Sequence, residues 1–186
     1  RNTLVTEAVV RKFSPAAVVL PETTFDANGL IIYGGGGHGK SLVDLVRLLD
    51  TYRVVGIVDD GLPAGAEVLG VPVLGGSAVL EELYARGLRL AVNAVGGIGN
   101  LAPRLKVFEL LAQVGFGFPT LLHPTAMVEA SAQMGAGGQV FAHAYIGSAA
   151  QVGFGCTVNT GWIISHDCVL ADLVNIPPCP ILAGLV

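Results

Sequence analysis

The residues best suited to acid–base chemistry are His166 and its neighbour Asp167, which lie in the sequence SHDC. An imidazole titrates near neutral pH and can accept a proton from an attacking nucleophile. A carboxylate beside the ring can fix its tautomer and stabilise the imidazolium. The pair therefore predicts a general base with its orienting acid, and a solvated histidine without a chemical role is the alternative.

Glycine residues gather at a second place, where they could bind phosphate. The sequence GGGGHGKS matches GxGxxG between Gly34 and Gly39, and Asp59 follows Gly39 by 20 residues. Backbone N–H groups at a helix N-terminus can face a diphosphate, and a carboxylate at this offset can bind a ribose hydroxyl. The same letters also satisfy GxxxxGK[ST], the phosphate loop of NTPases. We predict a diphosphate-binding loop, and a glycine turn without a ligand is the alternative. The residues of the predicted loop are Gly34, Gly35, Gly36, Gly37, Gly39 and Lys40.

Histidine and cysteine residues do not form a metal-binding pattern. His123, His143 and His166 share no ligand spacing such as HxxxH, so no metal is predicted. The chain has three cysteines, an odd number, and no CxxC pair. This usage indicates a reducing compartment, without a disulfide framework or structural zinc.

The glycine loop lies in a stretch where apolar runs alternate with amphipathic segments. Apolar runs occupy residues 30–33, 53–60, 70–76 and 88–97, and helical spacings occupy residues 41–50, 77–87 and 102–115. This alternation predicts a small parallel sheet with helices on its faces. Residues 1–28 carry no pattern that assigns them to an element.

After Phe118 the helical spacing gives way to a period of six. Every sixth residue is aliphatic or Met: Leu122, Val128, Met134, Val140, Ile146, Val152, Val158, Ile164, Leu170, Ile176 and Leu182. A three-sided β-solenoid with coils of about 18 residues explains this period, whereas helices and flat strands do not. In this frame Cys156 and Cys168 point inward and His166 faces out at a corner. Glycine is expected at the corners, and the bulky Trp162 either widens a coil or lies at a subunit contact.

The composition and charge of the chain exclude several classes of protein. Hydrophobic residues make up 52% and charged residues 13% of the chain, which is typical of a protein with a sizeable core. The formal charge of −4, without a Lys/Arg cluster, argues against nucleic acid as a partner. No apolar run approaches 18 residues, so no transmembrane segment is predicted and a cytoplasmic location is expected.

Five segments together resemble one known family. In chain order they are LIIYGGGGHGKS, VVGIVDD, GVPVLGG, FGFPTLLHPTAMV and VNTGWIISHDCVLADLVNIPP. Over about residues 29–186 the chain resembles the sialic acid O-acetyltransferase (NeuD-like) and PglD-like group of sugar acyltransferases. The resemblance implies a Rossmann-like α/β parallel-sheet domain at 29–118 that holds a nucleotide sugar. It also implies a left-handed parallel β-helix of hexapeptide repeats at 119–186 that forms homotrimers.

The resemblance also implies a reaction. Acetyl-CoA would lie between neighbouring subunits and acylate an amino group, or less readily a hydroxyl, of a nucleotide-activated sugar. His166 matches the general base of the family and Asp167 its supporting acid. His38 matches a position near the sugar, and Asp59 and Asp60 match positions near the nucleoside.

Two departures from the family pattern motivate other interpretations. Many members have a second histidine, associated with the acyl-CoA thioester, where this chain has Asn175, which can donate a hydrogen bond but cannot titrate. The sequence also ends at Val186, before further coils that relatives possess. A truncated, non-catalytic homologue that binds nucleotide sugar or only assembles as a trimer is therefore the alternative. A phosphate-loop NTPase or an NAD-dependent enzyme is a third possibility.

Overall fold

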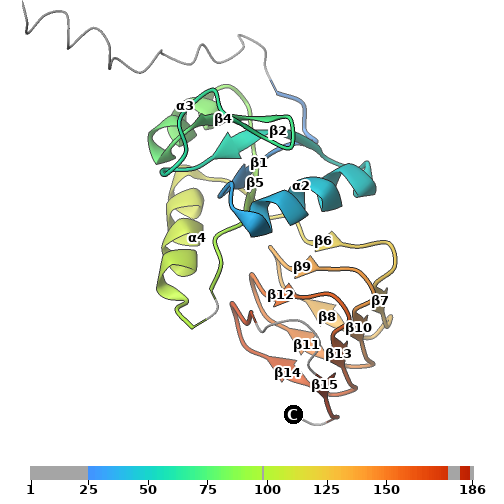
Figure 1. Ribbon diagram of the computed structural model, residues 1–186. Helices are drawn as coiled ribbons and strands as arrows, with labels where there is room; N and C mark the ends of the chain where they lie inside the picture. Colours follow the sequence, from blue (N-terminus) through green and yellow to red (C-terminus); the bar gives the residue numbers. More distant parts are fainter. Residues whose placement is uncertain (1–24, 98, 176–180, 185–186) are drawn as a thin grey trace, which may run out of the picture.

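The computed structural model describes residues 25–97, 99–175 and 181–184, and shows an α/β layer followed by a three-sided prism (Figure 1). Most of the unassigned segment 1–28 lies outside the described residues. Within the described part of the chain, no helix is long and apolar enough to cross a membrane.

The α/β layer is built on a five-stranded sheet. Its strands follow the order β3-β4-β2-β1-β5. Their bounds are β1 Gly29–Tyr33, β2 Arg53–Val58, β3 Glu67–Val68, β4 Val71–Gly75 and β5 Leu90–Asn93. All neighbours pair in parallel except the short edge strand β3, which pairs with β4 antiparallel. The predicted parallel sheet is confirmed.

Helices cover both faces of this sheet, as the alternating side chains of β1 require. Leu30 and Ile32 pack with helix α2 (Gly37–Leu49) on one face. Ile31 and Tyr33 pack on the other face, with helices α3 (Leu80–Ala85) and α4 (Ala102–Val114). Each fully buried aliphatic side chain stabilises this layer by about 1.5–3 kcal/mol. A 3₁₀ turn precedes α3 where a longer helix is predicted.

The prism consists of two-residue strands stacked in three parallel sheets. The first face contains β6 Leu121–Leu122, β9 Gln139–Val140 and β12 Thr157–Val158. The second face contains β7 Met127–Val128, β10 Tyr145–Ile146, β13 Ile163–Ile164 and β15 Ile181–Leu182. The third face contains β8 Gln133–Met134, β11 Gln151–Val152 and β14 Val169–Leu170. Leu121 pairs with Gln139, 18 positions later, and the predicted left-handed β-helix is confirmed.

The six-residue frame correctly places the interior of the prism. Its six central members, from Val140 to Leu170, are buried together with Cys156 and Cys168. Trp162 is fully buried in the same cluster, so its side chain lies in the interior and not at a subunit contact. Leu122 is 38% exposed because the first coil has no coil above it. The frame member Ile176 lies outside the described residues.

Seven successive corners of the prism, from Gly137 to Leu173, each turn through one residue in the left-handed conformation. These residues recur every six positions with φ between 58° and 72°: Gly137, His143, Ala149, Gly155, Gly161, Asp167 and Leu173. Glycine therefore fills only some of the corners where it is expected. Glycine is required at Gly135, Gly147 and Gly153 for a different reason, the close approach of the next coil. A Cβ at these positions would lie within 2.6–2.8 Å of main-chain atoms of that coil.

Candidate active site

The glycine loop joins strand β1 to helix α2, and two of its glycines are required by geometry. Gly34 has φ +111°, a conformation that side chains disfavour. A Cβ on Gly39 would lie 2.1 Å from the carbonyl oxygen of Gly34, so the helix can approach the strand only without a side chain there. Gly36 and Gly37 have open space around them and are exposed. Their backbone is therefore accessible to a ligand at the start of α2.

The two predicted acidic residues follow strand β2, beside the glycine loop. Asp59 Oδ2 accepts a hydrogen bond from the Gly35 N–H at 2.7 Å, and Oδ1 accepts one from the Gly61 N–H at 2.8 Å. Asp59 therefore shapes the glycine loop directly, in addition to its predicted place near a ribose.

Asp60 is held by groups from two other elements. Its carboxylate accepts hydrogen bonds from the Tyr33 hydroxyl at 2.5 Å and from the backbone N–H and hydroxyl of Ser77. The Tyr33 hydroxyl lowers the pKa of Asp60, and burial together with this carboxylate raises the pKa of Tyr33 to about 12. Asp60 is therefore ionised and Tyr33 is neutral at physiological pH.

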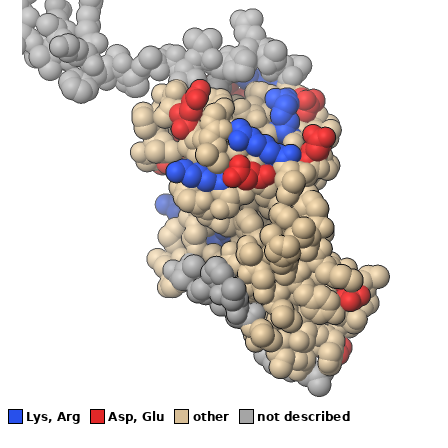
Figure 2. All heavy atoms as spheres, turned by 45° about the vertical axis from the view of Figure 1, so that its right-hand side comes forward, with Lys and Arg blue, Asp and Glu red and all other residues tan. Residues whose placement is uncertain are grey.

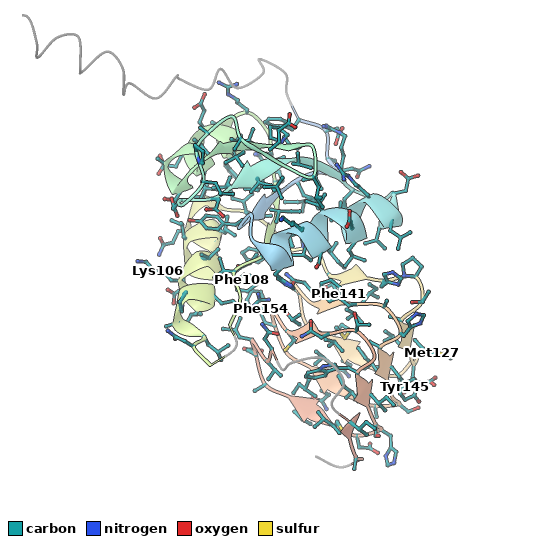
Figure 3. All side chains as sticks on the ribbon, in the orientation of Figure 1. Lys106, Phe108, Met127, Phe141, Tyr145 and Phe154 are labelled. Atoms are coloured by element: carbon teal, nitrogen blue, oxygen red, sulfur yellow. The ribbon has the colours of Figure 1, made fainter. Side chains whose placement is uncertain are left out.

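A cavity of about 420 Å³ opens between these residues and helix α4. Tyr33, Gly34, Asp59, Asp60, Gly61 and Ser77 line one side, and Val95, Pro103, Lys106, Val107 and Leu110 line the other. Sequence reasoning missed the α4 side, including Lys106, which Figure 3 labels. The spacing 103, 106, 107 and 110 marks one face of a helix, but it cannot tell which neighbour that face meets. Lys40 is exposed on α2 and lies outside this lining.

The side chain of His38 extends from the glycine loop to the prism. Its Nε2 lies 2.7 Å from Gln139 Oε1, and its ring is 5.6 Å from that of Phe141. Because Gln139 Nε2 donates to the Asn93 carbonyl, Oε1 is the acceptor and His38 Nε2 carries the proton. Burial lowers the pKa of His38, and the charge of Arg104 lowers it further.

His166 and Asp167 project from a corner of the prism, as predicted. His166 Nδ1 lies 2.7 Å from Asp167 Oδ2, and the two side chains are 63% and 49% exposed. A carboxylate can only accept, so Nδ1 carries the proton and the lone pair of Nε2 is free to act as a base. The ring lies over the next coil, where a Cβ on Gly184 would come within 2.6 Å of it.

One chain does not bring the glycine loop and His166 together. The α/β layer lies against the first face of the prism, where Gln139 contacts both His38 and Asn93. His166 follows β13 of the second face and precedes β14 of the third, so it occupies the edge opposite the first face. Asn175 lies apart from His166 as well, since it extends the first face by a bridge to Thr157 and accepts a hydrogen bond from Asn159.

No group of three His, Cys, Asp or Glu residues that could hold a metal ion occurs among the described residues. The cysteines Cys156 and Cys168 are free thiols in the prism interior, and burial raises the pKa of Cys156. Cys179 and the neighbouring prolines lie outside the described residues.

Comparison with known proteins finds sugar N-acetyltransferases among the similar proteins. Residues 29–111 match the family model of the PglD N-terminal domain. The chain is 34% identical to the UDP-N-acetylbacillosamine N-acetyltransferase of Bacillus subtilis over 114 residues, 60% of this chain and 50% of that protein. It therefore spans about half the length of this curated relative.

Solved structures match more of the chain. One is a mutant GDP-perosamine N-acetyltransferase from Caulobacter crescentus in complex with CoA and GDP-perosamine, with a TM-score of 0.71 and 32% identity, covering 78% of this chain and 67% of that one. Another is the acetyltransferase domain of PglB from Neisseria gonorrhoeae in complex with acetyl coenzyme A. It has a TM-score of 0.68 and 34% identity, and the match covers 79% and 69% of the two chains.

Proposed function

Because the chain belongs to the PglD-like family of sugar acyltransferases, we propose that it transfers an acetyl group from acetyl-CoA to an amino group of a nucleotide-activated sugar. The observation that carries the proposal is the exposed His166–Asp167 pair, whose Nε2 is free to accept a proton. Two of the similar proteins are named for a UDP-linked or a GDP-linked amino sugar, which makes these two nucleotides the first to test.

In the proposed reaction the amine nitrogen attacks the thioester carbonyl while His166 Nε2 removes its proton. The new N–C bond forms, the C–S bond breaks, and the CoA thiolate recovers a proton from the imidazolium. Asp167 stabilises the imidazolium through Nδ1. The rest of the rate enhancement comes from holding amine and thioester together.

The nucleotide sugar is assigned to the cavity beside the glycine loop. The exposed backbone of Gly36 and Gly37, at the start of α2, suits a diphosphate, and the ammonium of Lys106 can balance its charge. Asp59 and Asp60 remain the proposed contacts to the nucleoside. Asn175 is proposed to donate a hydrogen bond to the acyl-CoA.

We further propose that the site forms between copies in a homotrimer in the cytoplasm. The second face presents exposed apolar side chains, with Met127 at 60%, Ile163 at 38% and Ile181 at 70% exposure. Residues 119–186 contain no Lys or Arg, and Figure 2 shows charged side chains gathered over the α/β layer while the visible prism is nearly free of them. Such a surface suits contact with another copy.

Thiol release from acetyl-CoA with UDP- and GDP-linked amino sugars tests the reaction. We expect His166→Ala to lower the rate by about 10²–10⁴-fold, the range for loss of a general base. His143→Ala is the matched control, because His143 is also an exposed corner histidine of the prism. A His166→Ala rate equal to that of the native chain would remove His166 as the base.

Asn175 favours one other outcome, binding without turnover. In that case a UDP or GDP amino sugar raises the melting temperature of the native chain, as ligands of the folded state do, while no thiol is released. Stabilisation by ATP or NAD instead would favour the nucleotide-hydrolysing or dehydrogenase interpretations.

A further inference from the structure

The fully buried polar side chains of the described residues belong to one network. They are Asn93, Arg104, Gln139 and Thr157, each at most 1% exposed. Together with His38 they form what we call the junction network, between the α/β layer and the first face of the prism. Figure 3 labels Phe108, Phe141 and Phe154, which pack around this region.

Arg104 is the centre of the junction network. Its Nη1 donates to the carbonyl of Val95 at 2.8 Å, in the α/β layer. Its Nη2 donates to the carbonyl of Gly155 at 2.9 Å and to the hydroxyl of Thr157 at 3.1 Å, both in the prism. One rigid guanidinium therefore donates hydrogen bonds to both the α/β layer and the prism.

Gln139 supplies a second link beside Arg104. Its amide donates to the Asn93 carbonyl at 2.8 Å and accepts from His38 at 2.7 Å. Asn93 in turn donates to the Arg104 carbonyl and accepts from the Val95 N–H. The network therefore connects the start of α2, the end of β5 and helix α4 to the prism.

Stability alone does not account for a buried arginine here. No ion pair involves Arg104 within the described part of the chain, and its buried Nε has no hydrogen-bond partner. Burying a charge without an opposite charge is costly. An orienting role explains the residue better, because the guanidinium donors are aimed at carbonyls of two separate parts.

The contacts of Arg104 lie directly behind the proposed nucleotide-sugar cavity. Val95 lines this cavity, and so do Pro103, Lys106 and Val107 on the same helix as Arg104. A shift of α4 against the prism would therefore move one wall of the cavity. It would also change the distance from the bound sugar to the prism of a neighbouring copy.

We propose that Arg104 is a positioning residue, which through the junction network fixes the angle between the nucleotide-sugar cavity and the prism. This inference rests on the proposed acetyl transfer. It implies that the network matters for alignment of the two substrates and little for the binding of either one.

Arg104→Met tests the inference, with Arg47→Met as the control at an exposed site on α2. We expect kcat for thiol release to fall by about 10–100-fold, since a displacement of about 1 Å can cost this much. The KM for acetyl-CoA and the binding of the nucleotide sugar stay near native values. The melting temperature falls, because the carbonyls of Val95 and Gly155 and the hydroxyl of Thr157 lose their donor. Arg104→Lys restores only part of kcat, because a single ammonium cannot replace the fork.

A double-mutant cycle and a readout without substrate complete the test. Adding Thr157→Val to Arg104→Met should lower kcat no further, because the two residues act as one unit. Amide hydrogen exchange at residues 93–97 and 153–157 should rise in Arg104→Met and not in Arg47→Met. Unchanged exchange together with unchanged kcat would overturn the inference, and so would a fall in kcat that disappears when the assay is run well below the melting temperature of the variant. If the native chain releases no thiol, the proposed function fails while the exchange experiment still decides the positioning role.

Discussion

His38 shows how a buried contact decides the state of one residue. Gln139 accepts the Nε2 proton. Burial disfavours the charged ring and lowers the pKa of His38, the charge of Arg104 lowers it further, and the hydrogen bond to Gln139 opposes this shift only in part. The neutral ring is therefore the form that the folded chain stabilises. Its Nδ1 offers a lone pair, which suits a hydroxyl or amine donor of a sugar and not a phosphate oxygen.

The lowered pKa of His38 predicts a pH dependence of stability. An unfolded chain, with an imidazole pKa near 6.5, binds a proton that the folded chain resists, so the free energy of unfolding falls as the pH drops below about 6.5. His38→Gln keeps a donor for Gln139 and cannot titrate. Urea denaturation at pH 7.5, 6.5 and 5.5 should show a loss of stability in the native chain that is smaller in His38→Gln.

The two aspartates with lowered pKa values do not contribute to the stability change expected between pH 7.5 and 5.5. Asp26 and Asp60 have lowered pKa values, so their contribution is lost only below the ordinary carboxyl range near 3.8. Identical pH profiles for the native chain and His38→Gln between 7.5 and 5.5 would contradict the effect of burial on His38.

At the scale of the element, the close approach of α2 to β1 depends on one missing side chain. Gly39→Ala would push a methyl group into the Gly34 carbonyl, and we expect a loss of stability of about 1–3 kcal/mol, as for overpacking elsewhere. Gly37→Ala, in open space in the same loop, should be neutral or stabilising by at most about 1 kcal/mol. Chemical denaturation measures both, and equal effects would contradict the steric argument.

Elements set by a local period could be predicted from sequence, whereas their contacts could not. The six-residue period places Val140, Ile164 and Cys168 inside the prism and His166 outside it, because each position meets the same environment in every coil. Trp162 breaks the small-residue pattern, and only the packed interior shows that there is room for it. The partner of His38 is 101 residues away in sequence, and no local pattern encodes such a contact.

The same limit applies to the candidate site. GxGxxG and the offset of Asp59 predict the loop, since both follow from a strand turning into a helix. Lys106 and Arg104 were missed because both lie on α4, on faces that meet different parts of the molecule. Their roles depend on how whole elements pack.

For the whole molecule, the separation of the glycine loop from His166 predicts complementation between chains. Asp59→Ala chains and His166→Ala chains should each be nearly inactive. When the two are coexpressed, about one quarter of the sites in randomly mixed trimers would combine an intact loop with an intact base. Light scattering should give the mass of a trimer, and thiol release should recover in the mixture.

A mixture that stays inactive while trimers form would place both groups in one chain. Mixing two copies of the same variant is the control, because no combination then contains both intact parts.

The exact stacking of coils has a consequence for how this scaffold can vary. Inserting a single residue would turn the interior of every later coil outward, whereas duplicating 18 residues would preserve each side chain in its surroundings. A duplication placed before Ile163 would carry the imidazole about 4.8 Å further along the axis without altering its neighbours. The position of the imidazole along the prism axis can therefore change in steps of one coil, while the residues that surround the imidazole stay the same.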